Sequence, residues 1–413
     1  MRLSSGWTQL LLCLGVILVV FLLTQTRKPM LFYRRPTDVG PLDTEKLNLG
    51  LEDTQKTDFT EQLEKSALMS GDKNTNMSDQ GLVNSEKTTS TKQFVMTKVE
   101  KTGSSTLFAI MVRFIRFHKL NVLTQCHGHH IPWNPSKFAI GPENVSQADT
   151  LVNHAIYNIT MISKYIKPGY KHVGLAREPV SWFKSAVNFF ANSRNMGLPK
   201  QYSPEDVIFN DDILYQTRPT GQGVPRSWLH LNQLQWYGFN YADRYNLTAI
   251  ENFIASLIPR MDVMLLSDQF DASLLILRKR FNWSYLDIFY TSNRVATGKP
   301  SELSNKAITK LLSKEVNLGD KLLYDAMNRT WWQQHELAEA SFWEEVSHFR
   351  QLNKKVTEYC QTKINQQLQS LTVPASQWHE EFSVTHENCP NFDFSPSGSK
   401  SRALIIKYNT NCL

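Results

Sequence analysis

Several features are missing from this sequence, and each absence narrows what the protein can be. No tract rich in arginine or lysine occurs, although the net charge is +7 and the pI is near 9.0. Scattered basic residues favour an anionic ligand or surface and argue against nucleic acid as a partner.

No two aspartates are separated by a single residue, so the D-x-D metal motif of many glycosyltransferases is absent. No internal repeat occurs, and 41% hydrophobic residues in 413 are ordinary for one large or two modest globular domains.

Only one long hydrophobic run occurs, near the start of the chain. Between Arg2 and Arg27 lie 24 residues without a charge, and residues 10–23 are an unbroken apolar run. At about 1.5 Å per residue such a segment crosses a bilayer core of about 30 Å. No A-x-A-like cleavage site follows it. We therefore predict a signal anchor rather than a cleaved signal peptide, with a short cytoplasmic tail at 1–6 and a transmembrane helix at 7–26.

The flanks of this run and the rest of the chain point to opposite orientations. Arg27, Lys28, Arg34 and Arg35 outnumber Arg2, which by the positive-inside rule argues against an exported C-terminal part. Six N-x-S/T sequons spread along the chain favour the opposite orientation, with the body in the lumen of the secretory pathway. We predict a luminal body. The predicted glycosylation sites are Asn76, Asn144, Asn158, Asn246, Asn282 and Asn328.

Four cysteines follow the hydrophobic run, at Cys126, Cys360, Cys389 and Cys412. In an oxidising compartment they can form two disulfides, and three pairings are possible. The clustering of the last three predicts a C-terminal tail held by disulfides.

Composition divides the rest of the chain into a stem and a folded body. From about residue 36 to 92 the chain is rich in Thr, Ser, Asp, Glu, Lys and Asn and has few aromatic residues. Such a segment cannot offset the entropy of ordering, so we predict a flexible luminal stem at 27–93. Aromatic and branched residues become dense near Phe94, where the predicted luminal domain, 94–413, begins.

The folded body alternates strand and helix patterns. A short strand at 93–98 precedes a helix whose apolar positions are 107, 108, 111, 114, 115 and 118. A second strand at 172–176 precedes a helix over 180–190, and residues 260–281 contain a third strand that is again followed by a helix. Residues 303–368 are mostly helical in pattern. This order predicts an α/β fold with a mostly parallel central sheet, flanked by helices, that binds ligands at the carboxyl ends of its strands.

The turn between the first strand and its helix has the composition of a phosphate site. Lys101 and Gly103 stand beside four hydroxyl side chains just before the helix, where backbone N–H groups carry partial positive charge. The turn is not the triphosphate motif, because the lysine precedes the glycine and no leading glycine is present. A plain helix cap rich in Ser and Thr is the alternative interpretation.

A second pair of residues fits an anion. Arg177 ends the second predicted strand, and Ser185 follows eight residues later, about two turns along the next helix. An arginine fork and a hydroxyl in this arrangement can close on one phosphate. A salt-bridge role for Arg177 is the alternative.

Together these motifs resemble the paired signatures of Golgi sulfotransferases that use 3′-phosphoadenosine 5′-phosphosulfate (PAPS). The motifs are KTGSSTL at 101–107 and REPVSWFKSAV at 177–187. Three further stretches, 148–158, 261–290 and 318–334, are similar to the galactose 3-O-sulfotransferase family, which includes galactosylceramide sulfotransferase. The resemblance covers roughly residues 94–350.

The resemblance implies a P-loop-like sulfotransferase fold, PAPS as the sulfonate donor without a required metal, and a galactose on a glycolipid or glycoprotein as the acceptor. It also implies a type II protein of the Golgi membrane. In such enzymes the first loop holds the 5′-phosphosulfate and the Arg-x7-Ser pair holds the 3′-phosphate. The residues implied for the first task are Lys101, Thr102, Gly103, Ser104, Ser105 and Thr106, and those for the second are Arg177 and Ser185.

Sulfonate transfer also needs a base for the acceptor hydroxyl and a cation beside the leaving phosphate. Lys101 is the predicted cation. Relatives typically have histidine before this lysine, but this chain has Glu100, and we predict that this carboxylate is the base. His154, in another stretch similar to the family, is the alternative base or an acceptor-binding residue.

Other interpretations of the sequence are weaker. The string CHGHH at 126–130 has metal-ligating residues, but its spacing would strain a tetrahedral zinc site, and we predict an acceptor-side loop instead. A metal-independent Golgi glycosyltransferase and a non-catalytic, membrane-anchored glycan-binding protein are the alternative functions.

Overall fold

The computed structural model describes residues 90–389, with gaps at 127–129, 142, 144, 192–195, 199–200, 219–225, 292–301, 335–338, 363–369 and 386–387. The predicted tail, the predicted membrane helix and residues 27–89 of the predicted stem lie outside the described residues. Within the described ranges no helix combines the length and the apolar character that a membrane span requires.

A six-stranded sheet organises the described domain, in the order β10-β7-β1-β5-β2-β4. Its first five strands are parallel to their neighbours, and β4 is an antiparallel edge strand beside β2. The predicted α/β fold with a mostly parallel sheet is therefore confirmed. The strands are β1 (Phe94–Met96), β2 (Val122–Gln125), β4 (Phe138–Gly141), β5 (Thr150–Leu151), β7 (Lys171–Ala176) and β10 (Val263–Leu266).

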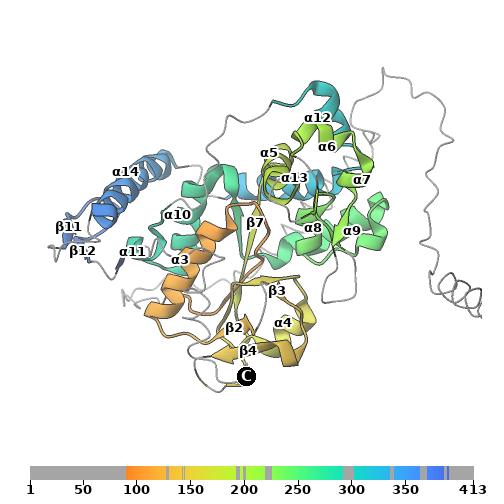
Figure 1. The fold of residues 1–413 in the computed structure, drawn as a ribbon. Coiled ribbons are helices and arrows are strands. Elements are labelled where there is room, and N and C mark those ends of the chain that lie inside the picture. Colours follow the sequence, from red (N-terminus) through yellow and green to blue (C-terminus); the bar gives the residue numbers. More distant parts are fainter. Residues whose placement is uncertain are drawn as a thin grey trace, which may run out of the picture. The chain divides into compact units, whose positions relative to one another are not determined.

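Each predicted strand and helix unit is present, and helices lie on both sides of the sheet (Figure 1). On one side lie α3 (Ser104–Phe117), α10 (Phe270–Phe281), α11 (Tyr285–Ile288) and α14 (Ala340–Thr362). On the other lie α5 (Pro179–Ala186), α8 (Asn232–Trp236), α9 (Leu247–Leu257) and α13 (Leu318–Trp332). The remaining elements are short: β3 (His130–Ile131), β6 (His154–Ala155), α4 (Ile159–Tyr165), α6 (Pro204–Ile208), α7 (Asp211–Leu214), β8 (Thr217–Arg218), β9 (Arg226–Ser227), α12 (Asn305–Leu311), β11 (Leu371–Val373) and β12 (Phe382–Val384).

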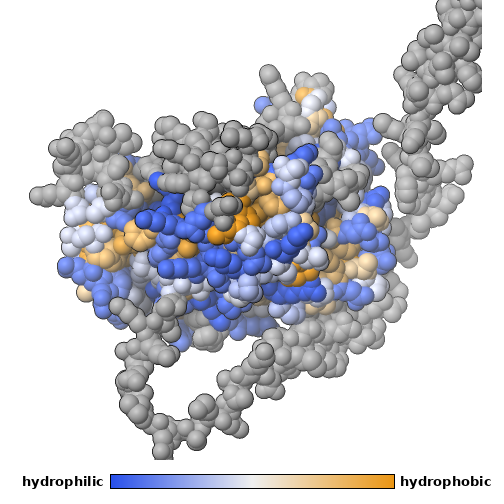
Figure 2. Space-filling view, turned by 90° about the horizontal axis from the view of Figure 1, so that it is seen from below, coloured by the Kyte–Doolittle hydropathy of each residue, from blue (hydrophilic) through white to orange (hydrophobic). Residues whose placement is uncertain are grey.

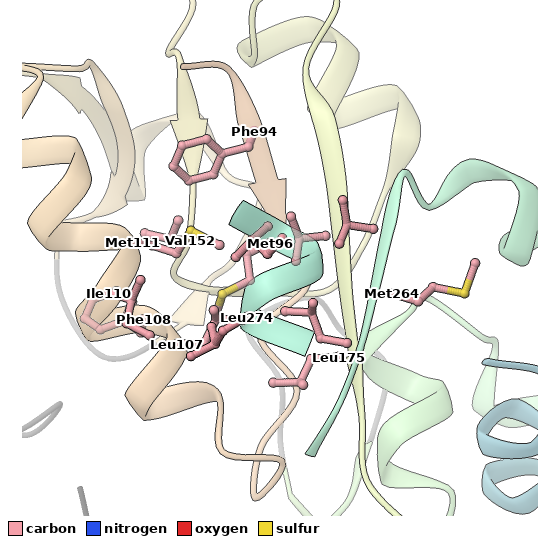
Figure 3. Packing of buried hydrophobic residues seen from close by; sticks show 14 of the residues in the cluster. Phe94, Met96, Leu107, Phe108, Ile110, Met111, Val152, Leu175, Met264 and Leu274 are labelled. Atoms are coloured by element: carbon pink, nitrogen blue, oxygen red, sulfur yellow. The ribbon is translucent and has the colours of Figure 1, made fainter. Parts of the chain in front are cut away.

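The core forms where helix faces meet the sheet. Leu107, Phe108 and Met111 of α3 pack toward Met96 of β1, and Leu274 of α10 lies nearby (Figure 3). These α3 residues are at most 5% exposed, as their helical spacing predicts. Burial of an apolar side chain of this size stabilises a fold by about 1.5–3 kcal/mol. This packing holds the strand before the turn 97–103 and the helix after it in place.

A second hydrophobic cluster surrounds α5, and it is separate from the core that covers the sheet. Trp182, Phe183 and Phe190 are buried there against residues of α6, α7 and α12. The helix predicted over 180–190 changes at Val187 into a π-helical turn, Val187–Ala191. Such a turn is frequent at functional sites.

The C-terminal part of the domain contains one of the predicted disulfides. Cys360 at the end of α14 is bonded to Cys389, which confirms a covalent link in the C-terminal tail. Cys412 lies outside the described residues, so the second pairing stays a prediction.

Hydrophilic residues cover much of the described part of the face in Figure 2, and apolar residues gather along its middle.

Candidate active site

Three neighbouring parallel strands end at the same edge of the sheet, and the candidate site begins there. The loop 97–103 follows β1, Arg177 follows β7, and Ser267 follows β10. The Ser267 hydroxyl donates a hydrogen bond to the carbonyl oxygen of Thr102, with 2.7 Å between the oxygens. The carboxyl ends of such strands are the usual ligand-binding edge of an α/β sheet.

The loop after β1 has a backbone conformation that few residues adopt. Lys101 has φ +62° and Gly103 has φ +77°, both in the left-handed region. For a lysine this conformation costs about 1–2 kcal/mol, so surrounding contacts must hold it. The N–H groups of Thr106 and Leu107 both donate to the carbonyl of Gly103, which starts α3. The N–H groups of Ser104 and Ser105, in the first turn, have no acceptor within the helix.

The hydroxyl groups of this loop divide into two sets. Those of Thr102 and Ser104 turn inward and donate to the carbonyl oxygen of Val99. Both side chains are buried, so they brace the loop from within. Ser105 is half-buried, and Thr106 is 8% exposed. The inward hydroxyls leave the backbone N–H groups as the main donors that the loop presents to an anion.

Arg177 joins the end of β7 to this loop. Its Nη1 donates to the carbonyl oxygen of Lys101 over 3.0 Å, and its Nε and Nη2 donate to Ser181 Oγ over 3.0 and 2.8 Å. The backbone of Lys101 is thereby fixed from a segment distant in sequence. Lys101 Nζ lies 4.1 Å from the ring centroid of Phe189, in the π-helical turn after α5.

A buried scaffold holds Arg177 in place. Its backbone N–H and carbonyl are both bonded by the side-chain amide of Gln233, in α8. Asp320 of α13 accepts hydrogen bonds from the backbone N–H groups of Gln233 and Leu234 and so caps α8. Burial raises the pKa of the Asp320 carboxyl to about 7, against the opposing effect of those two N–H groups.

The pairing of β1 with β7 ends at Val173. Beyond it, the hydroxyl of Tyr237 supplies hydrogen bonds to the backbone of β7 at Leu175. It accepts from the N–H of Leu175 over 2.7 Å and donates to the carbonyl of Leu175 over 3.0 Å. Gly174 permits this approach, because a Cβ there would lie 3.2 Å from the Tyr237 hydroxyl and 2.4 Å from Met261 Sδ. The end of β7 is therefore fixed two residues before Arg177.

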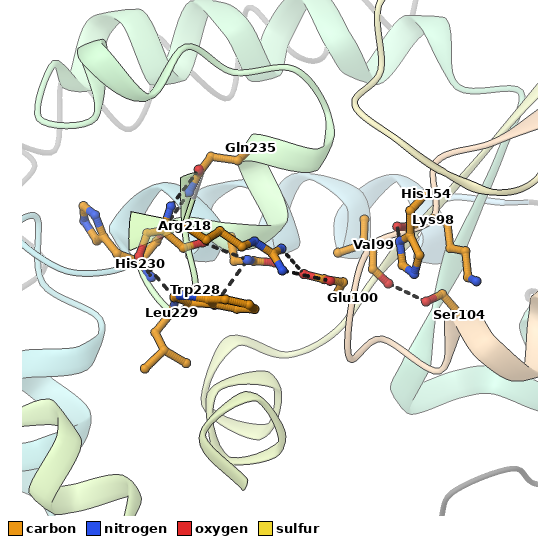
Figure 4. A network of polar contacts seen from close by, with 12 residues as sticks. Lys98, Val99, Glu100, Ser104, His154, Arg218, Trp228, Leu229, His230 and Gln235 are labelled. Carbon is orange, nitrogen blue, oxygen red and sulfur yellow. Dashed lines mark hydrogen bonds and ion pairs between the residues drawn. The ribbon is translucent and has the colours of Figure 1, made fainter. Parts of the chain in front are cut away.

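Glu100 lies in an ion pair. Arg218 Nη1 donates to Glu100 Oε1 over 3.3 Å, and Nη2 donates to Oε2 (Figure 4). Burial alone would raise the pKa of the Glu100 carboxyl, but Arg218 and Arg226 outweigh it and hold the pKa below its usual value. The backbone carbonyl of Glu100 accepts from Trp182 Nε1 over 2.8 Å. The carboxylate is thus ionised and already engaged by a guanidinium.

His154 approaches the loop from β6. Its Nδ1 lies 2.9 Å from the carbonyl oxygen of Lys98 (Figure 4), and its ring centroid lies 5.1 Å from that of Trp236. His130 pairs with it across the β3–β6 ladder. Burial, Lys98 and His130 lower the pKa of His154 well below its usual value. The imidazole is therefore neutral near pH 6.5.

The structure brings most of the predicted site residues into one region. The loop that contains residues 100–106 is joined to Arg177 by a hydrogen bond, and His154 of β6 contacts the same loop at the carbonyl of Lys98. Ser185 lies one helical turn beyond Ser181 on α5, and Ser181 is the residue that Arg177 contacts. His127 and His129 of the CHGHH string lie outside the described residues, whereas His130 lies beside His154.

Sequence reasoning missed three residues of the site: Ser181, Arg218 and Arg226. The spacing of Ser181, four residues after Arg177, could have indicated a contact across the start of α5. Nothing in the sequence pairs the two arginines with Glu100. Among the residues that the structure describes, no group of three or more His, Cys, Asp or Glu side chains is arranged to hold a metal.

A family model described as galactose-3-O-sulfotransferase matches residues 44–380. The chain belongs to this family. The galactose-3-O-sulfotransferase match includes the loop, Arg177, His154 and the α13 segment that carries Asp320.

Curated members of the galactose-3-O-sulfotransferase family are distant relatives of this chain. Mouse galactosylceramide sulfotransferase is 24% identical over 279 residues, which are 65% of this chain and 64% of that protein. Mouse galactose-3-O-sulfotransferase 2 is 23% identical, over 64% of this chain and 68% of its own. Bovine galactose-3-O-sulfotransferase 3 is 23% identical, over 57% and 56%. The chain thus spans somewhat under two thirds of the first of these relatives. No solved structure matches it.

Proposed function

We propose that this protein transfers the sulfonate of PAPS to the 3-hydroxyl of a galactose on a glycolipid, such as a galactosylceramide, or on a glycoprotein glycan. The galactose-3-O-sulfotransferase family supports the reaction class. The hydrogen bond between Arg177 and the carbonyl of Lys101 supports the proposal, because it joins the two segments that we propose as anion sites at one edge of the sheet.

The donor groups of this edge suit a doubly phosphorylated nucleotide. In this proposal the N–H groups at the start of α3 and Lys101 hold the 5′-phosphosulfate, and Arg177 holds the 3′-phosphate. A guanidinium has five N–H donors, and Arg177 uses three of them on Lys101 and Ser181. Two N–H groups are left for a phosphate. Ser185, on the same helix face as Ser181, is proposed to bind the same 3′-phosphate through its hydroxyl.

We propose His154 as the base. In the tautomer that donates Nδ1–H to the carbonyl of Lys98, Nε2 keeps its lone pair and can accept the proton of the acceptor hydroxyl. The hydroxyl oxygen bonds to sulfur while the bond from sulfur to the 5′-phosphate oxygen breaks. Lys101 stabilises the charge on that leaving oxygen. In this scheme Glu100 positions Arg218 and takes no proton, since its carboxylate is bound by that arginine.

We also propose that the protein is a single-pass type II protein of the Golgi membrane with its catalytic domain in the lumen. The apolar run 10–23 and the spread of sequons support this topology. Three of the sequon asparagines, Asn158, Asn246 and Asn282, are exposed in the described domain.

The test is a transfer assay on the full-length protein in detergent, with labelled PAPS and three acceptors. These are galactosylceramide, a galactose-terminated N-glycan and a galactose-terminated O-glycan. We expect label on the 3-hydroxyl of galactose in at least one of them, and the preferred acceptor identifies the substrate class. A folded protein that labels none of the three contradicts the proposal.

A further inference from the structure

Two arginines face one another beside the loop after β1. Arg218 and Arg226 are direct partners in the antiparallel β8–β9 pair, so their side chains project from the same face of this ribbon. Like charges placed directly opposite each other are destabilising. Glu100 offsets part of this repulsion, because it is bound to Arg218 and lies within the electrostatic reach of Arg226. The single negative charge of Glu100 therefore faces the two positive charges of Arg218 and Arg226.

The two arginines differ in how their hydrogen-bond donors are used. Arg218 donates to Glu100 and lies over the ring of Trp228, with its guanidinium carbon 4.2 Å from the centroid. Arg226 is only 4% exposed, yet within the described part of the chain its Nε and Nη2 have no hydrogen-bond partner. Its guanidinium carbon lies 3.6 Å from the centroid of Trp236.

Trp236 has the same deficit. Its ring is fully buried, and its Nε1 also lacks a partner among the described residues. Three donor atoms on two contacting side chains are therefore unsatisfied. An unsatisfied buried donor costs about 1–3 kcal/mol, more for a charged group, so such groups in native proteins call for an explanation. Oxygen atoms of a bound group are the acceptors that such donors require.

The position of this pair relates it to the chemistry. The Trp236 ring lies beside His154, at 5.1 Å between centroids, and beside His130, at 5.3 Å with the two planes 10° apart. His154 contacts the carbonyl of Lys98, and Arg226 interacts with Glu100, two residues further along the same loop. Burial lowers the pKa of Arg226 to about 9 and Glu100 opposes this, so the guanidinium is charged at neutral pH.

We propose that Arg226 and Trp236 form an oxyanion subsite next to His154, which binds sulfonate or carboxylate oxygens during the reaction. This inference rests on the proposed function and deepens it. The oxyanion has two chemical sources: the sulfonate group of the donor, or a carboxylate on the acceptor sugar. In the first case the subsite stabilises the group in transfer, and in the second it selects acidic galactosides.

The experiment compares nucleotide affinities of the full-length protein by calorimetry. PAPS carries the sulfonate and 3′-phosphoadenosine 5′-phosphate lacks it. For a sulfonate subsite, Arg226→Gln raises the Kd of PAPS on the order of 10- to 100-fold, the usual weight of a hydrogen bond to a charged group. The Kd of the nucleotide without sulfonate changes less than about twofold. Trp236→Phe keeps the ring, removes one donor and gives a smaller effect in the same direction.

A second arm tests the carboxylate source. Methyl β-galactoside and methyl β-galacturonide differ only in the carboxylate at the sixth carbon. For an acceptor subsite, Arg226→Gln leaves PAPS affinity unchanged and lowers kcat/KM for the galacturonide, relative to the galactoside, about tenfold or more. Arg226→Lys, which keeps the charge but not the fork, provides a second variant if Arg226→Gln does not fold.

The matched control is Arg278→Gln. Arg278 also lies over an aromatic ring, 4.6 Å from the centroid of Tyr285, and it binds Glu345 away from the loop after β1. Arg278→Gln should change neither the ratio of the two nucleotide Kd values nor the ratio of kcat/KM for the two sugars. The inference is overturned if folded Arg226 variants keep both the nucleotide ratio and the acceptor ratio of the wild type, or weaken both nucleotides equally. Failure of the wild type to bind either nucleotide would instead refute the proposed function.

Discussion

The guanidinium of Arg177 donates a hydrogen bond to the carbonyl oxygen of Lys101, over 3.0 Å and across 76 residues of sequence. This contact ties the end of β7 to the loop after β1. Lys101 adopts a left-handed backbone conformation there, which is costly for a lysine and is held by its neighbours. The contact therefore brings together the two segments that we propose to bind the phosphate groups.

The assignment of the base predicts an asymmetry between two variants. His154→Ala should lower kcat about 10²- to 10⁴-fold, the usual contribution of a general base. Glu100→Gln should lower kcat less than about tenfold, because it removes an ion-pair charge and leaves the base intact. Steady-state kinetics with saturating PAPS measure both, and His118→Ala, at the end of α3, is the control. A loss in Glu100→Gln as large as that in His154→Ala would instead favour Glu100 as the base.

The pH dependence tests the same assignment independently. Burial and the nearby cation Lys98 hold the pKa of His154 well below its usual value of 6.5. The imidazole therefore keeps its lone pair as the pH falls through 6.5. We expect kcat/KM to show no acidic limb near that value. A limb centred at pH 6.5 that disappears in His154→Ala would contradict the described environment of this histidine.

Tyr237→Phe tests the support of β7. The variant keeps the ring and leaves the N–H and carbonyl of Leu175 without their partner. We expect the free energy of unfolding to fall by about 1–3 kcal/mol. Urea titration measures it, and Tyr245→Phe, at a tyrosine that is 39% exposed, should change it by less than about 0.5 kcal/mol. Equal effects of the two substitutions would show that the Tyr237 hydroxyl contributes nothing specific.

The raised pKa of Asp320 predicts that the free energy of unfolding depends on pH. Burial raises its pKa from 3.8 to about 7, so between these values the native state binds a proton that the unfolded state has lost. Its contribution to stability is therefore largest in acid and is lost as the pH rises through 7. The advantage of the wild type over Asp320→Asn should shrink by about 2–3 kcal/mol between pH 5 and pH 8. An advantage that grows over this range in urea titrations would have the wrong sign.

The exposed sequons predict a glycosylation pattern for a luminal domain. Asn158 and Asn246 cap α4 and α9 through Oδ1, which leaves the side-chain nitrogen available for a glycan, and Asn282 is exposed at the end of α10. Asn328 is half-buried inside α13. Mass spectrometry of the protein from secretory cells should find glycans at the first three positions and, contrary to the expectation from its sequon alone, none at Asn328. Absence of all glycans would contradict the proposed topology.

Much of the fold follows from patterns visible in the sequence. The units β1–α3, β7–α5 and β10–α10 were predictable because apolar strands precede helices with a continuous buried face, as at Leu107 and Met111. The helical pattern after residue 303 is confirmed by α12, α13 and α14. Strand β5, Thr150–Leu151, was not predictable, since two residues carry no periodicity.

The site was predictable only where its residues follow strands. Lys101 lies in the loop after β1 and Arg177 directly follows β7, and these two strands pair, so sheet topology brings the residues together. Arg218 reaches Glu100 across 118 residues from a two-residue strand, and no local pattern anticipates that contact. The π-helical turn that places Phe189 under Lys101 was also missed, because its sequence fits a continuing α-helix.

The central claim is that the loop after β1 and Arg177 hold opposite ends of one nucleotide. The most direct measurement is the Kd of 3′-phosphoadenosine 5′-phosphate and of adenosine 5′-phosphate, for the wild type, Arg177→Ala and Lys101→Ala. Arg177→Ala should weaken the first about 10-fold or more beyond its effect on the second, because only the first has a 3′-phosphate, whereas the lost contact with Lys101 affects both. Lys101→Ala should weaken both. Equal loss of both nucleotides in Arg177→Ala, or of neither, would contradict the account.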